Sequence, residues 1–151
     1  MNWIKMFNEL LKDDKNYYPI RFFEPITKEK LEEITDTMKI TITGDILELL
    51  QQTDGIFSNT FGGYLVLSSK KIIDCYIHHL MYLKEIDNTF SNNYMFFADN
   101  GCGEYFGYEV CNGKIKSNQI GIYYPIENEY RIVAPNLYTW ATEWYTGKLS
   151  T

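Results

Sequence analysis

Apolar residues return every three or four positions in several parts of the chain, as in helices with one buried face. In residues 27–38, for example, Ile34 and Met38 follow at this spacing after Thr27, a typical N-cap residue. The pattern predicts helices over residues 3–13, 27–38, 44–52 and 68–83, with Thr27, Thr43 and Ser68 or Ser69 as N-caps. In the last of these the buried stripe is expected to be Ile72, Tyr76, Leu80 and Leu83. A final helix is expected to have Pro135 in its first turn and to end at Gly147.

Shorter segments rich in aromatic and β-branched residues predict strands over residues 64–67, 94–98, 104–110, 120–124 and 130–133. Asn112-Gly113 is a strong hairpin signal, and residues 127–129 form the next expected turn. Pro19 and Pro25 bracket a segment expected to be irregular. Hairpins dominate and βαβ alternation is missing, so we predict an α+β fold: one domain over residues 1–151, with several helices packed against a mostly antiparallel sheet.

Composition supports one folded domain. The chain has 151 residues, of which 45% are hydrophobic and 23% charged, close to globular averages. No apolar run approaches the roughly 20 residues of a membrane-spanning helix, and Lys5 and Glu9 interrupt any signal peptide. Three cysteines without CxxC spacing fit a reducing compartment. We therefore expect a cytoplasmic protein that does not bind a membrane.

Charge and aromatic content point to protein binding. The net charge of −6 disfavours direct contact with nucleic-acid phosphates but suits a basic partner. Aromatic residues make up 17% of the chain, and 13 of the residues are tyrosines. Most are expected in the core and sheet, yet exposed tyrosines are also typical of protein-binding surfaces.

Motifs for catalysis are weak. The glycines of residues 101–107 have the wrong spacing for a dinucleotide loop and precede a strand where a helix is needed. The spacing of Cys75, His78 and His79 is that of candidate metal ligands on a helix, but the two adjacent histidines point about 100° apart. We expect Cys75 to act as a small hydrophobic residue, His79 to be half-buried and His78 exposed. We thus predict no metal, no cofactor and no enzyme activity; a small enzyme using His79 with Cys75 is the alternative.

Residues 96–108, Phe-Phe-Ala-Asp-Asn-Gly-Cys-Gly-Glu-Tyr-Phe-Gly-Tyr, resemble the central motif of the SUKH superfamily. Residues 46–50 with Asp54-Gly55 resemble its early helix and glycine turn, and residues 122–124 and 133–140 resemble its later strand and closing segment. Glu104 stands where Asp is commoner, and Thr43 where Pro is usual. The resemblance covers about residues 27–147. It identifies Asp54, Gly55, Asn100, Gly101, Gly103 and Gly107 as structural motif residues.

The resemblance implies a non-enzymatic domain. In bacteria such domains mostly neutralise a cognate toxin, often a nuclease at the C-terminus of a larger secreted polymorphic toxin. A YobK-like protein paired with an LXG-type toxin is the nearest type that we suggest. The fungal relatives, which regulate cell-wall synthesis, imply the alternative of a regulatory scaffold. We expect a monomer or weak homodimer.

An acidic inhibitor can occupy the groove of a basic nuclease, with its carboxylates in place of phosphates. Carboxylates on the predicted turns and strands are expected to form one rim, with tyrosines between them as anchors. These predicted partner-binding residues are Asp99, Glu104, Tyr105, Tyr108, Glu109, Tyr123, Tyr124, Glu127 and Glu129. For Asp99 and Asn100 a purely structural role is the alternative, because such side chains shape turns by bonding to nearby backbone.

Overall fold

The computed structural model describes residues 1–85 and 94–151. In these ranges the helices are α1 (Trp3–Leu11), α2 (Lys28–Met38), α3 (Asp45–Leu50), α4 (Ser69–Glu85) and α5 (Leu137–Tyr145). Asn2, Thr27 and Asn136 cap α1, α2 and α5, because each side chain accepts a hydrogen bond from a backbone N–H in the first turn. No helix in the described ranges is long and apolar enough to cross a bilayer.

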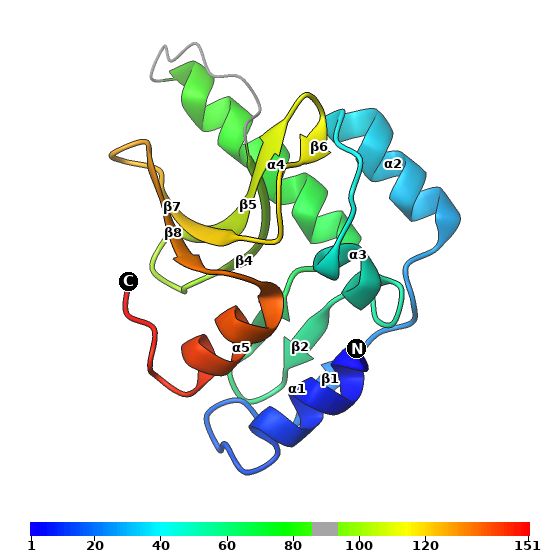
Figure 1. The fold of residues 1–151 in the computed structure, drawn as a ribbon, viewed down its shortest axis with the longest axis vertical. Coiled ribbons are helices and arrows are strands. Elements are labelled where there is room, and N and C mark those ends of the chain that lie inside the picture. The colour runs from blue at the N-terminus through cyan, green and yellow to red at the C-terminus, as the bar shows by residue number, and fades with distance from the viewer. Residues whose placement is uncertain (86–93) are drawn as a thin grey trace.

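Two antiparallel sheets lie between these helices (Figure 1). The small sheet has the order β1-β2-β3, with strands β1 (Ile20–Phe22), β2 (Ile56–Ser58) and β3 (Gly63–Val66). The large sheet has the order β4-β5-β7-β8, and β6 pairs with β5. Its strands are β4 (Tyr94–Asp99), β5 (Tyr105–Cys111), β6 (Lys114–Ile115), β7 (Ile120–Tyr124) and β8 (Glu129–Ala134). The predicted α+β class is confirmed.

Helices cover both faces of the large sheet. On one face, His79 of α4 packs edge-on against Phe96, with ring centroids 5.4 Å apart. On the other face, the ring of Trp140 in α5 packs against two strand residues, with centroid distances of 4.9 Å to Phe97 and 5.3 Å to Phe106. Successive residues of a strand point to opposite faces, so a strand buried on both sides reads as a continuous apolar run. This explains why residues 95–98 are all buried.

The two sheets are joined edge to edge. The N–H of Leu67, just after β3, donates to the carbonyl of Phe97 in β4 at 2.8 Å. The buried hydroxyl of Tyr145 in α5 donates to the carbonyl of Leu65 at 2.9 Å. Residues from α1 to α5 belong to one hydrophobic cluster. The small sheet and the large sheet are therefore parts of a shared core.

Most predicted elements are confirmed, including the hairpin at Asn112-Gly113. These two residues have φ of 51° and 73°, both left-handed, as a type I′ turn requires, and Cys111 pairs with Lys114 across it. The final helix ends at Tyr145, two residues before the predicted Gly147, and Gly147 has a left-handed φ of 77° just after the C-cap residue Thr146. Of the two alternatives for α4, Ser68 is the cap, because its hydroxyl accepts from the N–H of Lys71 at 3.3 Å.

Four local predictions are wrong. The segment between Pro19 and Pro25, expected to be irregular, contains strand β1, and β2 was not predicted either, because segments of three residues are too short to show a period. Gly44, with φ of 78°, takes the N-cap position of α3 in place of Thr43. Pro135 lies outside α5, because Asn136 after it is the cap. The buried stripe of α4 is rotated: Ile72 and Leu83 are buried with Ile73 and His79, whereas Tyr76 and Leu80 are partly exposed.

Candidate functional site

The loop of residues 99–104 and the turn of residues 125–128 lie at the same end of the large sheet. Tyr105, which opens β5, pairs with Asp99 on β4 and with Tyr123 on β7. One residue further along β7, Tyr124 pairs with Glu129 and closes the second turn. Both turns therefore project from the end shown on the left of Figure 1. We call this surface the loop end; it consists of residues 99–105 and 124–129.

The first turn is held by its own side chains. Asp99 Oδ1 accepts from the N–H of Gly101 at 2.8 Å. Asn100 Oδ1 accepts from the N–H of Cys102 at 2.9 Å and of Glu104 at 3.3 Å. Gly101 has φ of 78°, which L side chains rarely adopt. One carboxylate oxygen of Asp99 thus shapes the turn, and the residue is exposed.

A shallow groove of about 370 Å³ runs from this turn onto helix α4. Its lining contains acidic, basic and apolar side chains. The lining residues are Leu67, Lys71, Asp74, Cys75, His78, Asp99 and Tyr105. Burial, together with nearby Cys75 and Asp99, raises the pKa of Tyr105 to about 12. The phenol therefore stays protonated well above neutral pH.

Cys75 and His79 do not have the electrostatics of a catalytic pair. Burial, followed by the charge of Asp99, raises the pKa of the Cys75 thiol to about 12. Burial also lowers the pKa of His79 to about 4, with His78 adding to the effect. A nucleophilic cysteine needs a lowered pKa, so this environment opposes thiolate formation. In residues 1–85 and 94–151 no three His, Cys, Asp or Glu side chains gather as a metal site would require.

Two predicted anchors are wrong. Tyr108 and Tyr123 have no exposed surface, so neither can contact a partner in this structure. Tyr108 points into the core beside Phe97, and burial raises its pKa well above the usual value. Tyr123 packs against His79, and its hydroxyl donates to Asn128 Oδ1. Strand residues alternate between faces, but here both faces are covered, so alternation alone did not reveal an exposed side.

Glu109 is also misplaced in the predicted rim. It lies four residues beyond Tyr105 on β5, roughly 13 Å along the strand at about 3.3 Å per residue. Its carboxylate faces Lys116 Nζ at 3.4 Å. Glu109 therefore belongs to the opposite end of the sheet. The predicted residues that meet at the loop end are Asp99, Glu104, Tyr105, Tyr124, Glu127 and Glu129.

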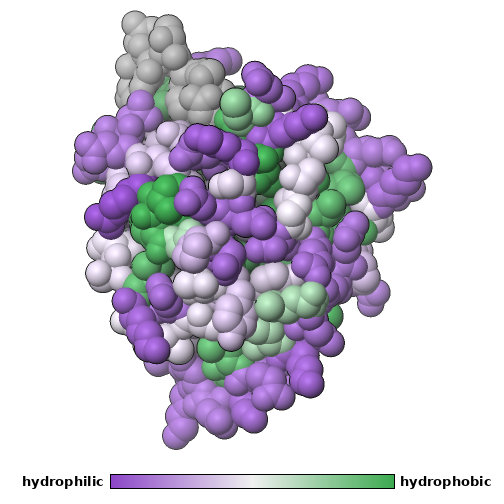
Figure 2. Space-filling model, viewed as in Figure 1, coloured by the Kyte–Doolittle hydropathy of each residue, from purple (hydrophilic) through white to green (hydrophobic). Residues whose placement is uncertain are grey.

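Phe61 is an exposed aromatic residue that the sequence analysis missed. Its side chain is 54% exposed, and its ring lies beside the loop end, 4.0 Å from where a Cβ on Gly101 would be. Its backbone is held in place, because its N–H donates to Ser58 Oγ at 3.0 Å. The Gly62-Gly63 turn after it was a usable signal for an exposed loop tip. Figure 2 shows further hydrophobic surface on the left, over the β7–β8 side of the sheet.

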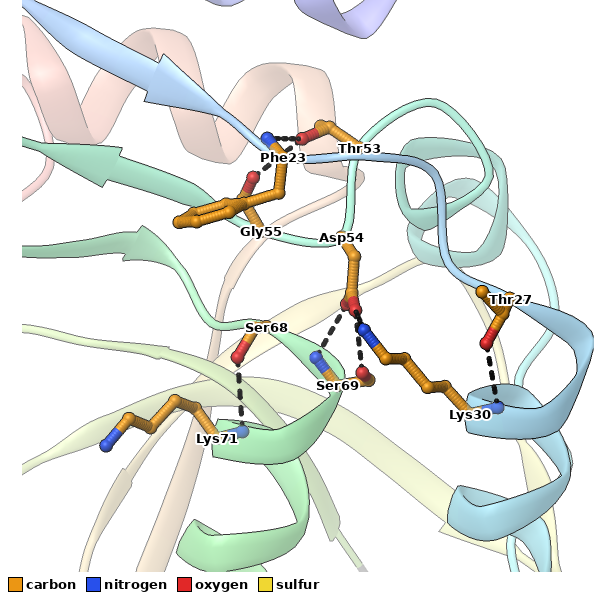
Figure 3. Close-up of polar contacts among 9 residues, drawn as sticks. All are labelled: Phe23, Thr27, Lys30, Thr53, Asp54, Gly55, Ser68, Ser69 and Lys71. Carbon is orange, nitrogen blue, oxygen red and sulfur yellow. Dashed lines mark hydrogen bonds and ion pairs between the residues drawn. The ribbon is translucent and has the colours of Figure 1, made fainter.

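Asp54 and Gly55 organise the start of α4, which lines the groove (Figure 3). Asp54 is buried; Oδ1 accepts from the N–H of Ser69 at 2.7 Å and Oδ2 from its hydroxyl at 2.8 Å. Lys30 of α2 adds an ion pair at 3.6 Å. Gly55 has φ of 105°, and a Cβ there would lie 3.0 Å from Ser68 Cα. These residues therefore position the start of α4.

Gly107 allows the strands beneath α4 to pack closely. A Cβ at Gly107 would lie 2.4 Å from the carbonyl oxygen of Met95. The ring of Tyr130 covers Gly121 on the next strand, and its hydroxyl donates to the carbonyl of Gly107 at 3.1 Å. Glycine at position 121 thus makes room for the tyrosine ring, and glycine at position 107 makes room for the backbone of β4.

Comparison with known proteins identifies a family. The model of the SMI1 / KNR4 family (SUKH-1) matches residues 25–143 of the chain. The matched segment runs from before α2 into α5 and so contains both turns of the loop end. No curated protein matches the chain.

Proposed function

Because the chain belongs to the SMI1 / KNR4 family (SUKH-1), we propose that it is an immunity protein that binds and neutralises a toxin made by the same bacterial cell. The toxin is a basic nuclease domain in this proposal, and the chain acts in the cytoplasm by occupying a surface of it, without catalysis. One observation supports this most: the loop end carries carboxylates from two separate turns.

Opposite charges are expected to raise the association rate of the proposed complex. The chain carries a net charge of −6, and Asp99, Glu127 and Glu129 are exposed at the loop end. A nuclease is positively charged where it holds phosphate. Opposite fields can raise association rates toward about 10⁸–10⁹ M⁻¹ s⁻¹ at low salt. Fast capture protects a cell that makes the toxin itself.

Rigidity favours affinity. The hydrogen bonds of Asp99 and Asn100 hold the first turn in one shape before any partner arrives. Binding then costs less conformational entropy than it would for a mobile loop. Tyr105 and Phe61 add aromatic surface beside the acidic groups, and aromatic residues are frequent energetic anchors of interfaces. The proposed contact surface therefore joins a charged part with an apolar part.

The first experiment is a survival assay. The reading frame next to this gene is expressed with and without the chain, using the C-terminal domain of any large neighbour. Rescue of growth supports the immunity role. A lethal neighbour that the chain does not relieve contradicts this pairing. If no neighbour is toxic, the alternative of a regulatory scaffold gains support.

Matched variants then test the surface. In Asp99→Asn/Glu104→Gln/Glu127→Gln three charges are removed while the acceptor at position 99 is kept. We expect slower association with the toxin and a weaker dependence of its rate on salt. The control is Glu32→Gln/Glu33→Gln/Asp36→Asn on exposed positions of α2, which changes the net charge equally. Equal effects of both triple variants would show that net charge alone, and not the loop end, directs binding.

A further inference from the structure

Strand β8 lies at the edge of the large sheet. In the large sheet β8 pairs with β7, and no other strand of residues 1–85 or 94–151 pairs with it. Throughout those same residues, no backbone hydrogen bond from a turn or loop reaches β8. Alternate N–H and C=O groups of an edge strand point away from the sheet. Such an edge is a template for another strand unless something protects it.

The side chains of β8 leave this edge uncovered. The ring of Tyr130 turns back over Gly121 of its own sheet, with its hydroxyl on the carbonyl of Gly107. The guanidinium of Arg131 lies over the ring of Tyr124, and the guanidinium carbon Cζ is 5.8 Å from the centroid of that ring. Its Nη2 donates to Tyr124 Oη at 3.1 Å. Both long side chains therefore lie along their own sheet.

Charges are the usual protection of an edge, yet those on β8 are complementary to an identical strand. Glu129 and Arg131 are two residues apart, so they lie on the same face of the strand. If two β8 strands pair antiparallel with Tyr130 opposite Tyr130, Glu129 of each copy lies opposite Arg131 of the other. Two-fold symmetry forms this pair twice. Opposite charges facing each other across strands are stabilising.

Apolar groups next to the edge favour the same register. Ile126, in the turn before β8, is 86% exposed, and Ile132 is 41% exposed. Pairing about Tyr130 brings the turn with Ile126 of one copy toward the Ile132 end of the other. Both isoleucines would then lose water contact, which is favourable for apolar surface.

We propose that two copies of this chain associate by antiparallel pairing of their β8 strands about a two-fold axis beside Tyr130. The two large sheets become one continuous sheet. Because one strand pair buries little surface, the dimer is weak and forms at high protein concentration. This inference does not depend on the proposed toxin, since it concerns the chain alone.

The test is the mass of the full chain in solution, measured by sedimentation equilibrium over a concentration series. The wild-type chain is expected to pass from monomer to dimer. Glu129→Arg or Arg131→Glu alone places like charges opposite each other twice, so each should weaken the dimer about tenfold. The double variant Glu129→Arg/Arg131→Glu should restore it. An equimolar mixture of the two single variants should form a heterodimer, because both charge pairs are again complementary.

Controls separate pairing from folding and from net charge. Glu32→Arg on α2 changes the net charge as Glu129→Arg does and should leave the dimer unchanged. Both Arg131→Glu and the double variant lack the contact between Arg131 and Tyr124. If the double variant dimerises again, loss of that contact cannot be the reason why Arg131→Glu weakens the dimer. Circular dichroism checks that each variant is folded.

A wild-type chain that is monomeric at every concentration overturns the proposal. So does a dimer that neither single variant weakens, because it would use another surface. Failure of both the double variant and the mixture to dimerise overturns the register. Finally, a chain that stays monomeric but pairs through β8 with a strand of a different protein would also overturn the proposal, because the edge would then bind another protein and not a second copy.

Discussion

At the scale of single residues, two glycines of the central motif differ in what a side chain would meet. A Cβ at Gly107 would lie 2.4 Å from a backbone oxygen. A Cβ at Gly103 would have no atom of another residue within 4 Å, apart from its two neighbours in the chain. Gly103 instead has φ of 96°, a conformation that costs an L residue energy. The same residue type is therefore needed for close packing at one position and for backbone conformation at the other.

We predict that Gly107→Ala lowers the free energy of unfolding by about 3 kcal/mol, because backbone must move to admit the methyl group. Gly103→Ala should cost about 1–2 kcal/mol, the price of the left-handed backbone alone. Urea denaturation of both variants measures the difference. Equal losses would contradict the distinction between clash and strain.

Asp54 is expected to matter more for stability than the lysine paired with it. Asp54→Ala removes two hydrogen bonds from the first residue of α4 and should cost about 2 kcal/mol. Lys30→Ala removes one ion pair at 3.6 Å from an exposed lysine and should cost under about 1 kcal/mol. Thermal or urea unfolding compares the two. A larger effect of Lys30→Ala would mean that the ion pair, and not the two hydrogen bonds of Asp54 to Ser69, holds α4 in place.

At the scale of elements, helix α4 connects stability to pH through His79. This side chain is 5% exposed and packs against Phe96 and Tyr123. Its pKa falls from 6.5 to about 4 because burial disfavours the cation. Between these two values the unfolded chain binds more protons than the folded one. The free energy of unfolding must therefore decrease as pH falls through this window.

We predict that this histidine accounts for a loss of about 3 kcal/mol between pH 6.5 and 4, at 1.36 kcal/mol per pKa unit. His79→Phe, which keeps an aromatic ring at this site, should flatten the pH dependence. His78→Gln, at the exposed neighbouring position, removes the smaller cause of the shift and should reduce the pH dependence only slightly, because burial is the larger cause. Urea unfolding at several pH values gives the slopes. An unchanged slope in His79→Phe would assign the dependence to carboxylates.

Local sequence signals predicted most elements, and their failures have physical causes. Caps such as Thr27 and the turn at Asn112-Gly113 depend on a few adjacent residues, so they can be read directly. Strands β1 and β2 depend on pairing with each other, with Ile20 opposite Ser58. Their three residues carry no period of their own. Elements stabilised mainly by distant partners were the ones missed.

At the scale of the whole molecule, the shared core predicts joint unfolding of the two sheets. Tyr145 of α5 bonds to Leu65 beside the small sheet, and Trp140 packs on the large one. We expect far-UV circular dichroism and tryptophan fluorescence to report one coincident transition in urea. Separate transitions would show that the sheets unfold independently. Tyr145→Phe should shift the single transition by about 1 kcal/mol, because it leaves a buried carbonyl without its donor.

The sequence alone was sufficient for the α+β class, the acidic character, most helices and the turn chemistry of residues 99–104, because each follows from composition or from neighbours along the chain. Tertiary structure decided which predicted site residues are accessible. Strand register gathers Asp99, Glu104 and Glu127 at one end and sends Glu109 to the other. Covering both faces of the sheet buries Tyr108 and Tyr123. Accessibility depends on which distant segments meet, and no local pattern encodes that.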